Sequence, residues 1–245
     1  MTDSEGLSPR NPTVQRLRRL ATRRNDRRDE GVFVVEGAPL IAEALAGGCE
    51  VLEEYIAPGA APVGTSPPIV LSPAALARVA TTETPRPNLA VVRRPNPGDL
   101  NSSSCILVLD RVADPGNVGT LIRSAEAAGV DAVVVTPGTS DPFAPKAVRS
   151  SAGAVFHQPI HELGLDRVIS AGFVTVGTSS HLGEDHRSAD WSGSVALILG
   201  NEAHGLDVDP DRWVRIVHRG RAESLNVAMA GTLLTFAMVN ARAVG

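Results

Sequence analysis

The chain alternates between two spacings of hydrophobic positions. Near its start, Val14, Leu17 and Leu20 recur at intervals of three residues with arginines between them, which predicts an amphipathic, basic helix from about Pro12. Short runs rich in Val, Ile and Leu then alternate with further helical patterns. We therefore expect residues 1–98 to fold as a small α/β domain.

The second part of the chain carries short strands that are continuously apolar. They are predicted at residues 105–109, 132–136, 173–176, 195–199 and 214–217, with a weaker candidate at 154–156. Helical patterns fall between them, at residues 118–128, 145–151, 162–170 and 224–241. Strands without polar alternation are buried on both faces, as in a parallel sheet covered by helices. We expect an α/β domain over 105–245, joined to the first domain by an aperiodic linker at 99–104.

Composition fits a soluble globular protein. The chain has 245 residues and 43% hydrophobic content, enough to bury the cores of two small domains. No run of about eighteen apolar residues occurs, and the polar N-terminus lacks the pattern of a signal peptide. We expect a cytoplasmic protein with no membrane partner. Cys49 and Cys105 match no metal spacing, so reduced thiols and no metal site are predicted.

Charge is distributed unevenly along the chain. The formal net charge is −4, yet eight arginines accompany a single acid, Asp26, between Arg10 and Arg28. The planar guanidinium group suits bidentate contact with phosphates. This segment is therefore either a nucleic-acid contact surface or a solvated, charged helix face.

Three polar blocks follow predicted strands of the second domain. They are Asn117–Arg123, Leu199–Leu206 and Glu223–Ala228. In an open α/β sheet, ligands collect at the carboxyl ends of strands, where loops and helix N-termini offer unpaired N–H groups. We expect Asn117 near a helix N-cap and Ser224 as the N-cap of the last helix, roles that need no further function.

Together these blocks resemble the signature motifs of the SpoU/TrmH family of RNA ribose 2′-O-methyltransferases, which use S-adenosylmethionine. The segment Phe143–Ala154 is also similar to a stretch of that family. The N-terminal domain, through Val34–Gly37 and Leu40–Leu45, is similar to the L30e-like domain of members that modify large-subunit ribosomal RNA. The resemblance implies a SPOUT-type parallel sheet with a trefoil knot, a homodimer, and 23S ribosomal RNA as substrate.

The resemblance also implies roles for individual residues. Arg123 would orient the acceptor phosphate, since its pKa above 12 makes it an awkward base, and Glu202 would hold Arg123 by a charge-assisted pair. Further catalytic residues are expected at Asn117, Ser224 and Asn226. The cofactor site is expected at Thr178, Gly200, Ile216 and Leu225. The residues expected to bind RNA are Arg16, Arg19, Arg23, Arg24 and Arg27.

Other functions are less compatible with the sequence. No Gly-x-Gly-x-x-Gly follows a predicted strand, which disfavours both a dinucleotide-dependent oxidoreductase and a Rossmann-type methyltransferase. Two alternatives remain open: a transfer RNA 2′-O-methyltransferase, and a non-catalytic module that binds ribosomal RNA. The second would need none of the three polar blocks.

Arg219, after the last strand, adds positive charge near the expected RNA entrance.

Overall fold

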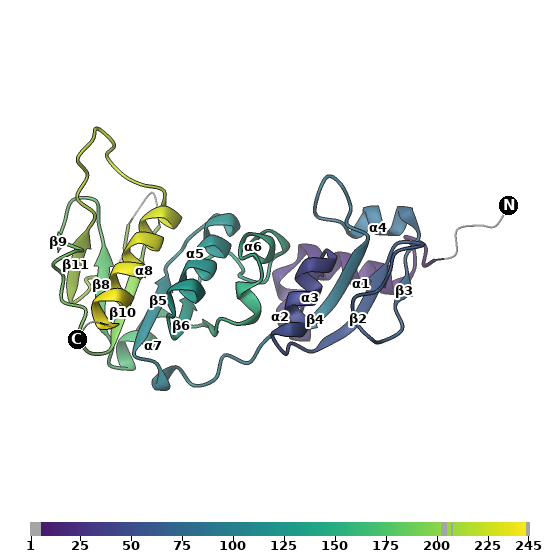
Figure 1. Cartoon of the computed structure of the whole chain (residues 1–245), viewed down its shortest axis with the longest axis horizontal. Coiled ribbons are helices and arrows are strands. Elements are labelled where there is room, and N and C mark those ends of the chain that lie inside the picture. Colours follow the sequence, from purple (N-terminus) through teal and green to yellow (C-terminus); the bar gives the residue numbers. More distant parts are fainter. Residues whose placement is uncertain (1–5, 202–204, 207, 244–245) are drawn as a thin grey trace. The chain divides into compact units, whose positions relative to one another are not determined.

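The computed structural model of the chain describes residues 6–201, 205–206 and 208–243. The chain divides into two compact units (Figure 1). The first unit comprises Met1–Pro95 and Phe143–Phe156, and the second comprises Asn96–Pro142 and His157–Gly245. The segment Phe143–Phe156 thus packs with the first unit, although it follows strands of the second in sequence. The domain boundaries 1–98, 99–104 and 105–245 remain a prediction.

The first unit is built on a sheet of four strands. The strands are β1 (Val32–Glu36), β2 (Val51–Ile56), β3 (Ile69–Val70) and β4 (Asn88–Arg93), in the spatial order β1-β4-β2-β3. Strand β4 is antiparallel to both of its neighbours, and β2 pairs with β3 in parallel. The helices are α1 (Pro12–Thr22), α2 (Arg24–Glu30), α3 (Ala38–Ala46), α4 (Pro73–Val79) and α6 (Pro145–Ser150).

Helix α1 illustrates how local sequence sets this unit. The Asn11 side chain accepts a hydrogen bond from the Thr13 N–H at 2.9 Å, and Pro12 occupies the first turn, where its missing N–H costs nothing. The predicted apolar stripe of α1, including Val14, Leu17 and Leu20, is fully buried against the sheet and α4. The amphipathic helix predicted from the sequence is confirmed.

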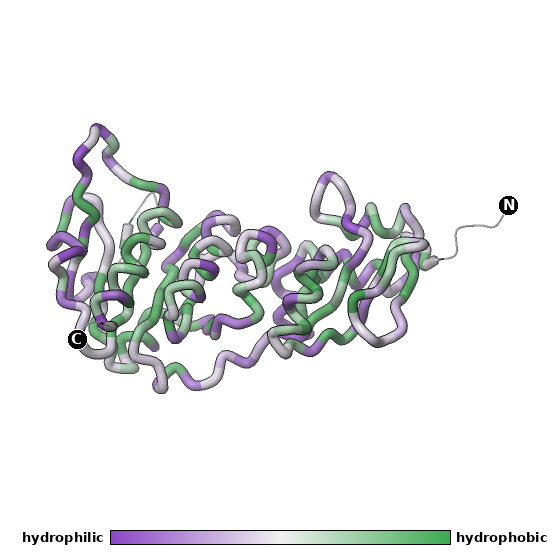
Figure 2. Tube along the Cα trace, viewed as in Figure 1, coloured by the Kyte–Doolittle hydropathy of each residue, from purple (hydrophilic) through white to green (hydrophobic). Residues whose placement is uncertain are grey.

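The second unit contains seven parallel strands. They are β5 (Cys105–Leu109), β6 (Ala132–Val135), β7 (Ile160–Glu162), β8 (Val174–Thr178), β9 (Glu184–Asp185), β10 (Val195–Leu199) and β11 (Arg212–Arg215). Their spatial order is β7-β6-β5-β10-β8-β11-β9, and every paired register is parallel. In Figure 2 the central strands are coloured as hydrophobic, which agrees with the continuous apolar runs in the sequence.

Helices cover both faces of this sheet. Ile106 and Ile198 pack with Val168 of α7 (Leu165–Ser170) on one face. On the other face, α5 (Pro115–Ala128) and α8 (Val227–Ala243) lie side by side (Figure 1), joined by a 2.7 Å hydrogen bond between the hydroxyls of Ser124 and Thr232. Because all strands are parallel, their carboxyl ends meet at a single edge of the sheet.

Several predicted elements differ from the structure. Residues 154–156, a weak strand candidate, form a 3-10 turn, because their apolar side chains are buried by packing and not by strand pairing. The last strand spans 212–215 and not 214–217, and the last helix starts at Val227 and not at Ser224. The short elements α2, β7, β9 and the 3-10 turn Leu100–Ser102 were not predicted. Among the described residues, no helix has both the length and the apolar character needed to cross a bilayer.

Candidate functional site

Loops at the carboxyl edge of the second unit enclose a cavity of about 560 Å³. It lies beyond the ends of β8, β10 and β11 and beside the first turns of α8. Its lining residues are Thr178, Ser179, Ser180, Leu182, Gly200, Asn201, Gly205, Leu206, Trp213, Ile216, His218, Ser224, Leu225, Val227, Ala230 and Leu234. The four residues predicted to bind a cofactor, Thr178, Gly200, Ile216 and Leu225, all line it. Three separate strand ends therefore contribute to one site.

Gly200 lets the following turn close against the strand end. A Cβ atom at this position would lie 2.8 Å from both the carbonyl carbon and the oxygen of Gly205, closer than real Cβ contacts. The turn is fixed by a hydrogen bond from the Gly205 N–H to the Asn201 carbonyl at 2.9 Å, and Gly205 has a positive φ of 66° that favours glycine. Both glycines thus form a backbone wall of the cavity.

Arg111 connects this wall to the loop that follows β5. It adopts a φ of 56°, which is rare for a residue with a side chain. Its carbonyl accepts from the Asn201 amide at 3.0 Å, and its guanidinium donates to the Gly205 carbonyl at 3.2 Å and to Asp110 at 3.1 Å. Thr136 donates to the other Asp110 oxygen at 2.7 Å. This network was not predicted; the polar pair Asp110-Arg111 directly after an apolar strand was its only sequence signal.

The structure also brings the first and third polar blocks together. The Asn226 amide donates to the Asn117 side-chain oxygen at 3.3 Å, and the Asn226 oxygen accepts from the N–H groups of Ala228 and Met229 at 2.9 and 3.3 Å. Asn226 is therefore the residue that caps α8, and the prediction of Ser224 as the cap is wrong. Ser224 lines the cavity instead.

Asn117 lies inside helix α5 and does not act as its cap. The true cap is Asp114, whose carboxylate accepts from the N–H groups of Gly116 and Asn117 at 2.6 and 3.1 Å, with Pro115 in the first turn. The helix thus begins three residues earlier than predicted. This shift places the Asn117 side chain beside the start of α8.

Arg123 is exposed on α5 and is not among the residues that line the cavity. The described part of the chain offers it no hydrogen bond or ion pair. Its predicted partner, Glu202, lies outside the described residues, so their pairing stays a prediction. Within the described ranges, no group of three or more His, Cys, Asp or Glu side chains converges in a way that could hold a metal ion.

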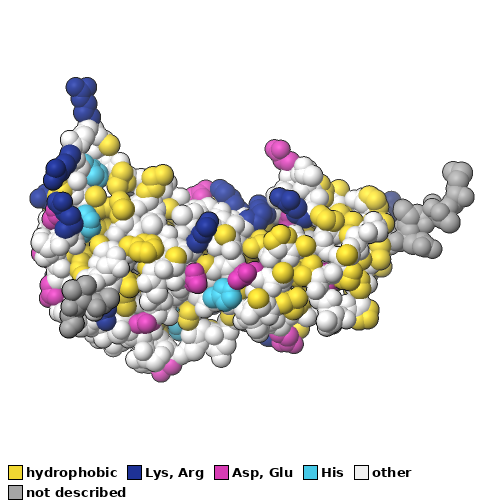
Figure 3. Space-filling view, in the orientation of Figure 1, with side chains coloured by type: hydrophobic (Ala, Val, Ile, Leu, Met, Phe, Trp, Pro, Cys, Tyr) yellow, Lys and Arg dark blue, Asp and Glu magenta, His cyan; other side chains and the backbone are white. Residues whose placement is uncertain are grey.

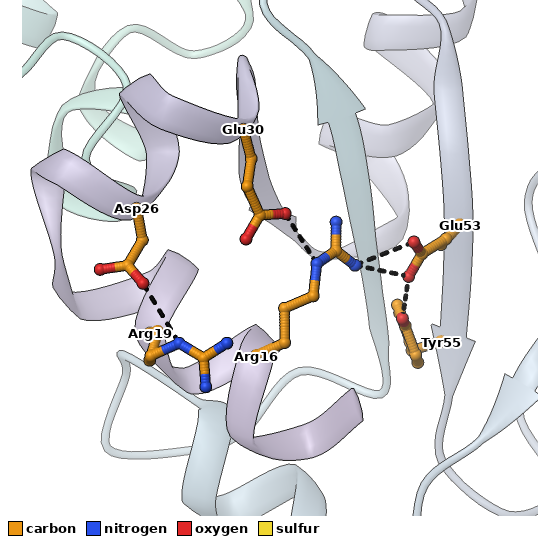
Figure 4. Close-up of polar contacts among 6 residues, drawn as sticks. All are labelled: Arg16, Arg19, Asp26, Glu30, Glu53 and Tyr55. Carbon is orange, nitrogen blue, oxygen red and sulfur yellow. Dashed lines mark hydrogen bonds and ion pairs between the residues drawn. The ribbon is translucent and has the colours of Figure 1, made fainter. Parts of the chain in front are cut away.

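Most of the arginines predicted to contact RNA in the first unit have internal partners. Arg16 lies between Glu30 at 2.7 Å and Glu53 at 2.9 Å, and Tyr55 donates to Glu53 (Figure 4). Burial, and then the bond to Glu53, raises the pKa of the Tyr55 hydroxyl, so this contact persists at alkaline pH. The charge of Arg16 is thus largely offset by its neighbours.

Two further arginines of this stretch are also engaged. Arg19 pairs with Asp26 at 3.1 Å (Figure 4) but remains exposed. Arg27 is only 4% exposed and donates to the Leu20 carbonyl at 2.6 Å, so it holds α2 against α1. This burial gives Arg27 a structural role and disfavours the predicted contact with RNA, which stays a prediction. Arg23 is exposed and Arg24 is half-buried, and their predicted roles remain open.

Comparison with known proteins assigns the two parts of the chain. Residues 104–236, more than half of the chain, match the SpoU rRNA Methylase family, and residues 11–90 match the MRM3-like substrate binding domain. The chain belongs to the SpoU methylase family. It is thus an RNA methyltransferase with an N-terminal substrate-binding domain, as the sequence motifs indicate.

Individual relatives extend over nearly the whole length. The 23S rRNA (guanosine(2553)-2′-O)-methyltransferase RlmP of Bacillus subtilis (strain 168) is 36% identical over 242 residues, which cover 94% of this chain and 96% of that protein. The SpoU methyltransferase AviRb from Streptomyces viridochromogenes, solved in complex with AdoMet, superposes with a TM-score of 0.84 at 29% identity. It covers 96% of this chain and 100% of its own. An AdoMet-bound rRNA methyltransferase from Sinorhizobium meliloti gives 0.79 at 29% identity, covering 94% and 95% of the two chains.

Proposed function

We propose that this SpoU-family enzyme transfers a methyl group from S-adenosylmethionine to a ribose 2′-hydroxyl of 23S ribosomal RNA in the cytoplasm. The observation that carries the proposal is the cavity at the carboxyl edge, where residues from three strand ends and the α8 start converge. The name of the Bacillus subtilis relative supports the substrate, and two AdoMet-bound structural relatives support the cofactor.

The cavity fits the proposed cofactor in shape and chemistry. Gly200 has no room for a side chain and Gly205 has a positive φ that favours glycine, so the wall they form carries no side chains and a flat group can approach its main-chain groups closely. Leu206 and Leu225 offer apolar surface to an adenine ring, while Thr178 and Asn201 offer hydrogen-bonding groups. When bound, S-adenosylmethionine supplies an electrophilic methyl group attached to a sulfonium.

The residues of this chain would position the acceptor. A ribose 2′-hydroxyl is a poor nucleophile, so transfer needs in-line placement and a path for the departing proton. Arg123 would bind the phosphate beside the acceptor ribose, and the joined amides of Asn117 and Asn226 would orient the sugar. Ser224, in the cavity lining, would contact the acceptor beside that amide pair, and Glu202 would hold Arg123.

We also propose that the enzyme is a homodimer through α8. Met229, Leu233 and Phe236 are 65%, 51% and 38% exposed, and their spacing of four and three residues places them on one face of the helix. We expect a second copy of the chain to cover this exposed apolar face of α8. A double variant, Met229→Glu with Leu233→Glu, should produce monomers in sedimentation experiments.

The trefoil knot is a further proposal. The chain crosses the carboxyl edge after β10 and again after β11, and then returns beside α5 as α8. Both passes line the cavity, at Gly200 and at Ile216, so threading one through the other would fix the cofactor site mechanically. The N-terminal domain would hold the RNA while this site acts.

The proposed function is tested by cofactor binding and methyl transfer. Calorimetry should detect S-adenosylmethionine binding, and labelled cofactor should methylate 23S rRNA taken from a strain that lacks this enzyme. Arg123→Ala should keep cofactor affinity and lose transfer, whereas Arg167→Ala, an exposed arginine on α7, should keep both. Transfer to tRNA alone would favour the tRNA alternative, and binding without any transfer would refute the enzymatic role.

A further inference from the structure

The loop between β11 and α8, residues 216–226, has two distinct sides. Ile216, His218, Ser224 and Leu225 line the cavity. The residues at its tip do not; Arg219 and Arg221 are exposed there, and Figure 3 shows Lys or Arg side chains at the tip of this loop. The same short loop therefore contacts the cofactor site and presents positive charge to solvent.

Within the described residues, the charge of these two arginines is not neutralised. Among the described residues, no carboxylate pairs with Arg219 or Arg221, and Glu223 is the one acid within the loop. Two nearby arginines outside the loop differ in this respect. Arg212 pairs with Asp190 at 3.1 Å, and Arg187 pairs with Asp185. The loop tip thus differs from Arg212 and Arg187, whereas exposed Arg215 of β11 has a carbonyl partner, His181 at 3.4 Å, and no carboxylate partner among the described residues.

The position of the tip matters because the acceptor must reach the cavity. The nucleotides on either side of the acceptor ribose carry phosphates, which must then lie near the cavity mouth. Arginine side chains there would gain affinity by releasing counterions from the RNA. A chain with a net charge of −4 needs such local cations, because its overall field disfavours RNA.

We propose that Arg219 and Arg221 form a contact surface for phosphates of the RNA strand that carries the acceptor ribose. This inference rests on the proposed function and deepens it, since it names the part of the catalytic unit that grips the substrate backbone. The contacts are to phosphates and not to bases, so they supply affinity and register without reading sequence.

The salt dependence of RNA binding provides the test. Each phosphate contact on a single strand adds about 0.7 to the slope of log affinity against log salt, so the double variant Arg219→Ala with Arg221→Ala should lower that slope by about 1.4. The same relation gives a loss of roughly tenfold in affinity at 0.15 M salt, which vanishes near 1 M. The probes are protein-free 23S rRNA and polyuridylate, with the full-length protein at several salt concentrations.

Three controls separate charge from folding. Arg219→Lys with Arg221→Lys keeps the charges and should keep the slope. Arg167→Ala removes an exposed arginine from α7, on the opposite face of the sheet from α5 and α8, and should leave the slope unchanged. Cofactor affinity and melting temperature should match the wild type in all variants.

Each outcome decides the inference. An unchanged slope in the double alanine variant, or an equal loss in Arg167→Ala, overturns it while leaving the proposed function intact if the wild type still methylates 23S rRNA. Equal loss of cofactor affinity in the alanine and lysine pairs would make the loop tip a structural part of the cavity, and would also overturn it. A wild type that neither binds S-adenosylmethionine nor transfers methyl would instead refute the proposed function.

Discussion

Gly200→Ala is the sharpest test of how the cavity is built. The added Cβ atom would lie 2.8 Å from the backbone of Gly205 and 2.8 Å from Leu206 Cδ2. The Leu206 side chain can rotate away, but the backbone contact cannot be relieved without moving Gly205. Overpacking of this kind costs about 1–3 kcal/mol. Because the displaced turn is a wall of the cavity, we expect cofactor affinity to bear most of this cost, a loss of about 5- to 150-fold.

The assay is calorimetric titration with S-adenosylmethionine, alongside a melting experiment without cofactor. Gly220→Ala is the matched control, because a Cβ atom there meets nothing within 4 Å and the residue has no positive φ. It should bind cofactor like the wild type. If Gly200→Ala binds as tightly as Gly220→Ala, the turn does not form the cofactor wall and the construction of the site given above is incorrect.

Three other predictions concern stability. Gly231→Ala on α8 would place a Cβ atom 2.4 Å from Leu199 Cδ1, so we expect destabilisation by about 1–3 kcal/mol in chemical denaturation; a wild-type midpoint would contradict the close packing of α8 on β10. Arg27→Ala removes a buried charged hydrogen bond and should cost about 1.5–3 kcal/mol, whereas exposed Arg23→Ala should cost almost nothing by the same measurement. Burial raises the pKa of the Cys105 thiol from 9.0 to about 11; since this group is held neutral in the folded state, its contribution to stability is complete below pH 9 and is lost as pH rises toward 11. Cys105→Ala should flatten that alkaline decline, and an unchanged pH profile would rule out this contribution.

The four residues predicted for the cofactor site line one cavity, whereas the ends of several elements around it differ from their predicted positions. Thr178, Gly200, Ile216 and Leu225 come from three strand ends and one helix start, and the parallel sheet places them all at one edge. That prediction came from the resemblance to the SpoU/TrmH family, and the parallel strand direction explains why these residues meet at one edge. The identity of the α8 cap required more, because Ser224 and Asn226 are both good capping residues and the path of the preceding loop chooses between them.

Other features depended on contacts that are distant in sequence. Burial of Arg27 requires the carbonyl of Leu20 on the adjoining helix, which a charge pattern does not reveal. The hydrogen-bond network at Arg111 includes the Gly205 carbonyl, which follows β10 and lies about ninety residues further along the chain. The start of α5 is different, because Asp114 and Pro115 are local signals that predict the observed cap. The start of α5 could therefore have been predicted from these two residues, whereas the spacing of apolar residues alone put it three residues too late.

The arginines of this protein show why charge counts along a sequence mislead about RNA contact. Arg16 occurs in the most cationic stretch, yet Glu30 and Glu53 reach it from a neighbouring helix and strand. Arg219 and Arg221 occur in a shorter cationic stretch, since residues 212–221 hold four arginines and no acid. Their loop extends from the sheet, where no described element brings an acid to them. Arginines on packed helices have acidic side chains of neighbouring elements within reach, whereas arginines on extended loops have few. The positive charge available to RNA is therefore set by which arginines the fold leaves unpaired, and in the catalytic unit those at the loop tip adjoin the cofactor cavity.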